Sequence, residues 1–154
     1  MDAEGHIRGG RKAVEAGFQV SEYWMPGLGG REHSRNHARN TARVLNAIDP
    51  HYIRSRPLHP WPGTPLQEAV EAGEHPLLSP AGQLEELREM IGALEVHSRV
   101  CFDHAANYWR NRRGGLLFSH SYEGYRFPGD KKRVLDLIEE GLRADQHEQR
   151  LMGM

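Results

Sequence analysis

The stretch FQVSEYWMPGLGGREHSRNHARNTARVLNAIDPHYIRSRPLHPWPGTPL, residues 18–66, contains two strand-like segments with a helical segment between them. Residues 18–25 are rich in aromatic and β-branched side chains and end at Pro26-Gly27, as expected of a strand that stops at a turn. Residues 51–58 have the character of a second strand, and residues 32–48 repeat apolar side chains at helical spacing. A strand, a crossover helix and a second strand predict parallel pairing of the two strands.

The rest of the chain continues this alternation. Ser79-Pro80 combines a serine N-cap with a proline at the first helical position, and an apolar stripe follows to about residue 95. We therefore predict an α/β fold with three parallel strands and with helices packed on one side. Three strands are too few for a closed barrel, which needs eight strand–helix units, so the pattern indicates part of a (βα) barrel or a small open sheet. The other predicted elements are helices at 4–16, 67–72 and 129–142 and a third strand at 97–102.

The composition restricts the classes of protein to which the chain can belong. It has 154 residues, 38% of them hydrophobic, which is room for one domain. The formal net charge is -1, which argues against a nucleic-acid-binding protein, because such proteins normally carry a basic excess. No window approaches the ~20 apolar residues of a membrane span. The first residues lack the pattern of a signal peptide, so we expect a cytoplasmic protein without a membrane segment.

Two glycine- and proline-rich loops are candidates for ligand binding. The first, Pro26 to Gly30, lies between a predicted strand and a predicted helix, where α/β proteins place ligands. The alternative is a tight strand-to-helix turn that needs glycine for its backbone. The second, Pro60 to Pro65, also follows a predicted strand, and its Trp61 could stack on a flat ligand. The alternative there is a structural turn covered by the Trp61 ring.

Other polar residues are weaker candidates for chemistry. His33 and His37 share a helix face, but no HExxH pattern accompanies them, so we expect surface residues of a solvated helix. Asp103 and His104, with Asn107 nearby, could form a general base, but no serine or cysteine nucleophile motif accompanies them, and local hydrogen bonding at a strand end is the favoured alternative.

Two further features of the third predicted strand and of the segment after it have ordinary explanations. Cys101 lies in the apolar strand, so a buried, inert thiol is expected. As the single cysteine, it excludes a disulfide within the chain and a cysteine-rich metal site, and it suits a reducing cytoplasm. The cluster Arg110 to Arg113 could contact an anionic ligand or RNA, but it is short and the chain has no basic excess, so a solvated loop is favoured.

Taken together and at this spacing, the two loops resemble those of the radical S-adenosylmethionine (radical SAM) superfamily, in the branch of the oxygen-independent coproporphyrinogen oxidase and Elongator-type enzymes. There, a strand ends in a G-φ-x-G-type loop, with φ apolar, and after a helix the next strand leads to a PGTPL-type loop. The segments Gly27-Leu28-Gly29-Gly30 and Pro62-Gly63-Thr64-Pro65-Leu66 match these two loops. The resemblance covers roughly residues 4–107. It implies that residues 1–107 are the later part of the barrel and that 108–154 are a loop and helical C-terminal extension.

The resemblance implies which groups the loops would hold. In the radical SAM superfamily a CxxxCxxC loop holds a 4Fe-4S cluster, which cleaves S-adenosylmethionine and starts radical hydrogen abstraction. This chain has one cysteine and no CxxxCxxC, so we expect no metal ligand and no stably bound cluster or S-adenosylmethionine in this chain alone. No catalytic residue is assigned. The resemblance places contacts to the adenosyl group at Gly27, Leu28, Gly29, Gly30, Leu58, Trp61 and Pro62.

We therefore interpret the chain as the C-terminal half of a radical SAM barrel, truncated or split from the half that carries the cluster and inactive alone. A half-barrel leaves strand 18–25 without a neighbour, so that strand is expected to pair with the missing N-terminal half or with a second copy of the chain. Two alternatives remain open. One is a non-catalytic α/β interaction module that pairs through the same sheet edge, and the other is a small-molecule-binding α/β protein that uses the two loops.

Overall fold

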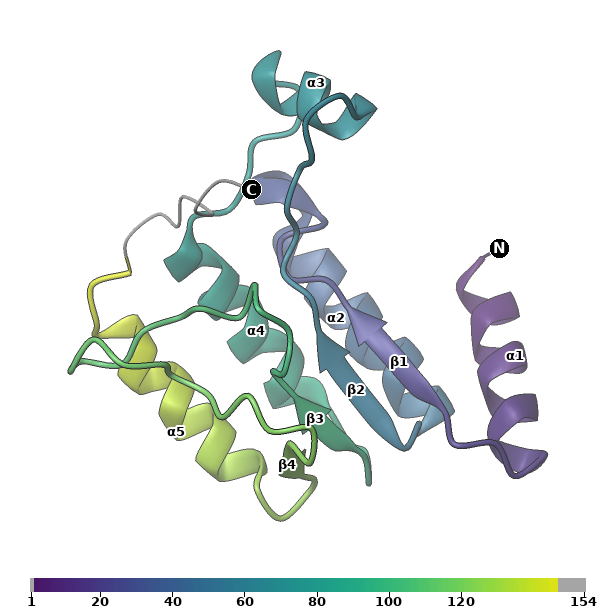
Figure 1. Ribbon diagram of the computed structural model, residues 1–154. Coiled ribbons are helices and arrows are strands. Elements are labelled where there is room, and N and C mark those ends of the chain that lie inside the picture. Colours follow the sequence, from purple (N-terminus) through teal and green to yellow (C-terminus); the bar gives the residue numbers. More distant parts are fainter. Residues whose placement is uncertain (1, 147–154) are drawn as a thin grey trace.

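The structure has the predicted alternation of strands and helices. The computed structural model describes residues 2–146, and this part of the chain contains five α-helices and a four-stranded sheet (Figure 1). It is an α/β fold, as predicted. In chain order the elements are α1 (Ala3–Glu15), β1 (Ser21–Trp24), α2 (Gly30–Ile48), β2 (Tyr52–Ser55), α3 (Pro65–Glu71), α4 (Pro80–Ala93), β3 (Arg99–Cys101), β4 (Tyr125–Arg126) and α5 (Lys131–Leu142).

The sheet has the strand order β1-β2-β3-β4. β1 pairs parallel with β2, and β2 pairs parallel with β3, so the three predicted parallel strands are confirmed. Their predicted ranges are too long, because the paired segments span only four residues in β1 and β2 and three in β3. β4 corrects the prediction, which placed no strand between residues 103 and 126. It pairs antiparallel with β3, and its two residues are too few to show a periodic pattern.

One face of the sheet is buried against helices. Trp24, Ile53 and Val100 lie on this face and are almost fully buried, whereas Tyr23 and Arg54 point to the opposite face, because side chains alternate along a strand. α2 packs against α4, α4 packs against α5, and α1 packs against α2. Figure 1 shows α2 and α4 behind β1 and β2. In the described part of the chain these helices therefore form one layer on one side of the sheet, as predicted.

The hydrophobic core lies between this helix layer and the sheet. On α2, the small residues Ala38 and Ala42 are fully buried and allow close approach to α4. The predicted apolar stripe of α4 is confirmed, since Leu84, Leu87 and Ile91 are fully buried, and each contributes roughly 1.5–3 kcal/mol by leaving water. Residues of both predicted segments, 1–107 and 108–154, belong to this cluster. Those of the later segment are Trp109, Leu117, Phe118, Tyr125, Phe127, Val134 and Ile138.

Gly124 makes the turn into β4 possible. Its φ is +59°, and a Cβ atom there would lie 2.5 Å from the Sγ of Cys101 and 2.5 Å from the carbonyl oxygen of Val100. The second of these neighbours is backbone of β3 and cannot move aside cheaply. The close approach of this turn to β3 therefore requires a residue without a side chain.

We predict that Gly124→Ala lowers the free energy of unfolding by about 2 kcal/mol or more, because it combines a clash with an unfavourable φ. The matched control is Gly9→Ala in the exposed part of α1, where a Cβ would meet nothing within 4 Å. The control should stabilise the protein by about 0.5–1 kcal/mol through helix propensity. Urea unfolding of both variants checks the prediction, and equal stabilities would contradict the close approach at Gly124.

Candidate functional site

The segments that lead into the two loops singled out from the sequence lie side by side at the carboxyl edge of the parallel strands. The backbone N–H of Arg56 donates to the carbonyl of Trp24 at 2.8 Å, and the N–H of Leu58 donates to the carbonyl of Pro26 at 2.9 Å. Parallel pairing thus continues two residues beyond β1 and three residues beyond β2. The structure thereby brings Leu58 next to the Gly27–Gly30 loop, at the edge of an α/β sheet where ligands are usually bound.

The Gly27–Gly30 loop is a tight turn that uses its glycines. Gly27 and Gly30 have positive φ values of 88° and 61°. A Cβ on Gly29 would lie 2.8 Å from the Cβ of His37, so this position also needs glycine. Leu28 projects from the turn and is 47% exposed. The need for a tight strand-to-helix turn, the alternative to a binding role, therefore explains the glycines. The exposed Leu28 is the part of the loop that can contact another molecule.

A buried carboxylate holds the Gly27–Gly30 loop in place. Glu86, on α4, is 3% exposed. Its Oε1 accepts hydrogen bonds from the backbone N–H of Gly27 at 2.8 Å and from Nδ1 of His37 at 3.1 Å, and its Oε2 accepts one from Oγ of Ser34 at 2.7 Å. The carboxylate joins the β1 loop, α2 and α4 at one point, and three donors replace the water that it loses on burial.

The expectation that His33 and His37 are both solvated surface residues is wrong for His37. His37 is not a solvated surface residue, because its side chain is 17% exposed and contacts Glu86. His33 is exposed, as expected. Glu86 was not among the predicted site residues, although its position in the sequence carries a signal. Glu86 is four residues before Met90, so it falls on the buried face of α4, where a charged residue needs a partner.

Trp61 and Pro62 lie in the segment that leads to α3. Both are exposed, and the Trp61 ring is 62% exposed and packs edge-to-face against His59 at 5.1 Å. Figure 1 shows α3 projecting beyond the carboxyl edge of the sheet, and none of its residues is buried. The ring of Trp61 is therefore accessible to another molecule, and it does not pack in the hydrophobic core.

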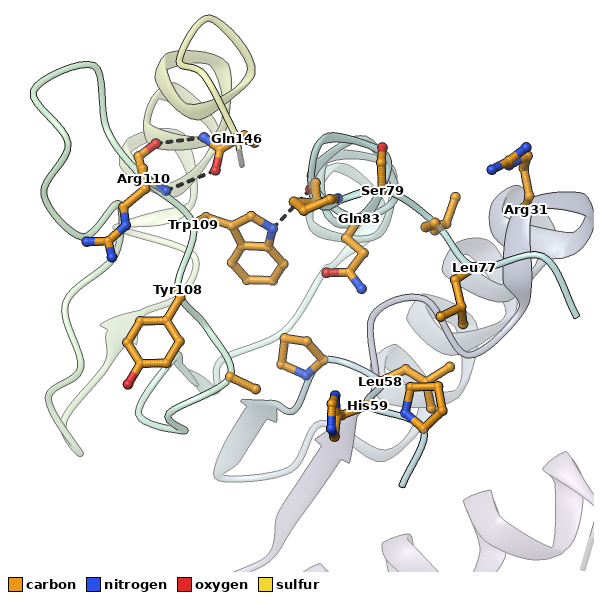
Figure 2. Close-up of a pocket in the computed structure, with 15 residues that line it drawn as sticks. Arg31, Leu58, His59, Leu77, Ser79, Gln83, Tyr108, Trp109, Arg110 and Gln146 are labelled. Carbon is orange, nitrogen blue, oxygen red and sulfur yellow. Dashed lines mark hydrogen bonds between the residues drawn. The ribbon is translucent and has the colours of Figure 1, made fainter. Parts of the chain in front are cut away.

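A cavity of about 530 Å³ opens at the same edge. It lies between the segment after β2, the segment after β3 and the N-terminus of α4 (Figure 2). Of the predicted site residues, Leu58 lines it, together with Tyr108 and Trp109 from the segment after β3. These two aromatic residues were not predicted to belong to a site, because the 103–126 segment has no periodic pattern that would place them.

The opposite face of the sheet carries an ion pair between Arg54 and Asp103, with Nη1 and Oδ2 2.8 Å apart. The rings of Tyr52 and Tyr122 lie 4.9 Å and 5.4 Å from the guanidinium carbon. Partial burial works against the charge of Arg54, but the hydrogen bond and the negative charge of Asp103 raise the pKa of Arg54 above its usual value. Asp103 is thus paired with Arg54, which argues against a role of Asp103 as the partner of His104 in a general base.

His104 takes part in local hydrogen bonds, as the favoured alternative predicted. Its Nδ1 accepts from the backbone N–H of Ala106 at 3.2 Å, and its carbonyl accepts from the side chain of Asn107 at 3.0 Å. Burial first, and then the positive charge of Arg56, lower the pKa of His104, so the imidazole is neutral at pH 7.

The arginines after β3 belong to an exposed turn. The Nη1 of Arg110 donates to the carbonyl of Gly114 at 3.1 Å, and Arg112 and Arg113 are exposed. This turn is the solvated loop that the sequence favoured.

The single cysteine does not fit an iron–sulfur cluster. Cys101 is fully buried, and burial raises the pKa of its thiol to about 11, so it is protonated and shielded at pH 7. Clusters are bound by several thiolates. In residues 2–146 no group of three or more His, Cys, Asp or Glu side chains is arranged to hold a metal ion.

None of the helices formed by residues 2–146 is long and apolar enough to span a membrane. No protein-family model matches the chain, and no curated protein matches its sequence.

We predict that Glu86→Ala lowers the free energy of unfolding by about 2–4 kcal/mol, because it leaves the buried donors of Gly27, Ser34 and His37 without an acceptor. Glu86→Gln should cost less, since an amide oxygen can still accept from Gly27. The control is Glu85→Ala, an exposed neighbour on the same helix. Urea unfolding and hydrogen exchange of the Gly27 amide measure the effect, and a similar stability of the Glu86 and Glu85 variants would refute it.

Proposed function

We propose that the chain forms the C-terminal part of a radical-SAM-like (βα) barrel, and that the loops after β1 and β2 form one wall of a site for an adenosyl group. The observation that carries the proposal is the hydrogen bond from the N–H of Leu58 to the carbonyl of Pro26, which joins the segments that lead into the two resembling loops at the carboxyl edge of a parallel sheet. The single helix layer also supports it, because a barrel has helices on only one face of its sheet.

The loops offer the kind of surface that an adenosyl group needs. Leu28 is 47% exposed and Leu58 is partly exposed, so both have apolar surface available for a flat base. Because Glu86 fixes the loop through the Gly27 N–H, the turn that presents Leu28 is held in place before any ligand arrives. A loop ordered in advance loses less entropy on binding.

The chemistry of a 4Fe-4S cluster and bound S-adenosylmethionine would be supplied together with the other part of such a barrel, because the buried Cys101 fits no cluster. The proposal therefore gives this chain the role of positioning the adenosyl group, and it assigns no catalytic residue within residues 2–146. Trp61 and Pro62 remain proposed contacts, on the exposed segment before α3.

We predict that S-adenosylhomocysteine, a stable analogue, binds the chain weakly, in the millimolar range, and shifts the amide resonances of Gly27, Gly29, Gly30 and Leu58 in ¹H–¹⁵N spectra. Leu58→Asp should abolish the shifts, because it places a carboxylate beside the apolar wall. The control is Leu116→Asp, in the exposed turn after β3. Shifts confined to other parts of the chain, or equal shifts in both variants, would contradict the proposed site.

A second proposed role concerns the free edge of β1. The N–H groups of Tyr52 and Arg56 bond to the carbonyls of Val20 and Trp24, so the backbone groups of Ser21 and Tyr23 point away from β2. In residues 2–146 no further strand pairs with this edge. Phe18, Tyr23 and Met25 are also exposed. Such an edge is a template for pairing, with the rest of a barrel or with a second copy of the chain.

We predict that the chain associates at micromolar concentration and that Ser21→Pro reduces this association. Proline removes an N–H that faces the free edge, while the hydrogen bonds between β1 and β2 remain. Ser21→Ala, which keeps the N–H, is the control. Light scattering after size exclusion gives the mass of each protein. A well-folded monomer at all concentrations would rule out self-pairing and leave only a different partner for this edge.

A further inference from the structure

Basic side chains line the cavity at the carboxyl edge, and among the described residues no acidic side chain does so. Its lining residues include Arg31, His59 and Arg110 but neither aspartate nor glutamate. In the described part of the chain, the guanidinium of Arg31 has no hydrogen-bond or ion-pair partner, although most other arginines of α2 are paired with a carboxylate. The guanidinium of Arg110 is bonded to Gly114, so Arg31 is the free cation of this cavity.

Further unpaired donors surround the same space. The amide of Gln83, the hydroxyl of Tyr108 and the ring of His59 line the cavity, and none makes a hydrogen bond within residues 2–146. Figure 2 shows the Gln83 side chain projecting toward the space in front of the Trp109 indole. Each of these three groups can donate a hydrogen bond as well as accept one, and Arg31 only donates, so a ligand with acceptor groups can satisfy all of them.

The other wall of the cavity is apolar and rigid. Trp109 is 3% exposed, and its Nε1 donates to the carbonyl of Pro80 at 3.0 Å, which fixes the plane of the ring. Leu58 and Leu77 also line the space. In Figure 2 Trp109 and Arg31 lie at opposite ends of it. A ligand that fills the cavity would therefore have an apolar body at one end and its charge at the other.

We propose that this cavity binds a small organic anion that has a flat, apolar body and a carboxylate or phosphate group. The body lies against Trp109 and Leu58, Gln83 bonds to its polar edge, and Arg31 binds the anionic group. The volume of about 530 Å³ is in the range of small-molecule sites. This inference rests on the lining of the cavity and does not depend on the barrel proposal.

The cavity fits S-adenosylmethionine poorly, which separates this site from the proposed adenosyl wall. That molecule carries an ammonium and a sulfonium group, and cations of this kind need a carboxylate or several carbonyl acceptors. No carboxylate lines the cavity. Arg31 could pair with the carboxylate of that molecule, but the net charge of the molecule is positive and Arg31 would repel both positive groups.

Three probes test the proposal on the chain itself. 2-Naphthoate has the flat body and the charge, 2-naphthamide has the body without the charge, and inorganic phosphate has the charge without the body. Dissociation constants come from ¹H–¹⁵N titrations in which the shifted amides also locate the site. The variants are Arg31→Gln and Arg31→Lys, and the control is Arg8→Gln, an exposed arginine on α1. Thermal unfolding verifies that all variants are folded.

We expect 2-naphthoate to bind at millimolar or lower concentration and to shift amides at Leu58, Gln83 and Trp109. Arg31→Gln should weaken it about tenfold, the effect of losing one charge-assisted hydrogen bond. Arg31→Lys should restore part of the affinity, and Arg8→Gln should change nothing. The amide and phosphate should both bind more weakly than 2-naphthoate. 5′-Methylthioadenosine, which has the adenosyl group but no carboxylate, should bind independently of Arg31, so the two proposals can fail separately.

Three results would overturn the inference. The first is an absence of saturable 2-naphthoate binding. The second is equal affinity for 2-naphthoate and 2-naphthamide, or an Arg31→Gln variant that binds like the control, since either would remove the role of the charge. The third is phosphate binding as tight as that of 2-naphthoate, which would remove the role of the apolar body.

Discussion

The buried carboxylate of Glu86 is the constraint on which the carboxyl edge of this protein depends. A charged group in the core is tolerated only when hydrogen bonds replace its lost hydration, and Glu86 obtains them from Gly27, Ser34 and His37. These donors belong to the loop after β1 and to α2. The requirement to satisfy one carboxylate therefore sets how α2 and α4 pack, and it fixes the turn that leads from the sheet into α2.

The two faces of the sheet differ in a way that follows from this packing. The face toward the helices holds Trp24, Ile53 and Val100 in a hydrophobic core, whereas the opposite face holds Arg54 paired with Asp103 between tyrosine rings. A polar, aromatic second face and a free β1 edge suit a sheet that continues in another chain or another segment. Both features agree with the proposed barrel, in which that face would line the interior.

The carboxyl edge combines two surfaces of different chemistry. The loops after β1 and β2 present partly exposed leucines, whose apolar surface suits a neutral base. The cavity beside them is bounded by Trp109 and by the unpaired Arg31, which suits an anion. Leu58 belongs to both surfaces. Ligands bound at the two surfaces would both contact Leu58.

Local pattern determined the strand–helix alternation, the parallel pairing of three strands, the apolar stripe of α4 and the two loops at the ends of adjacent strands. These features depend on spacing and on proline or glycine within a few residues, which a sequence displays directly. The partners of Glu86 and Arg54, the two-residue strand β4 and the cavity wall at Trp109 were decided only by the tertiary structure. Each of these joins residues 25 to 59 positions apart, or lies in a segment without periodicity. Their geometry arises when the helices pack against the sheet, because only then is a charged group buried and in need of hydrogen-bond donors.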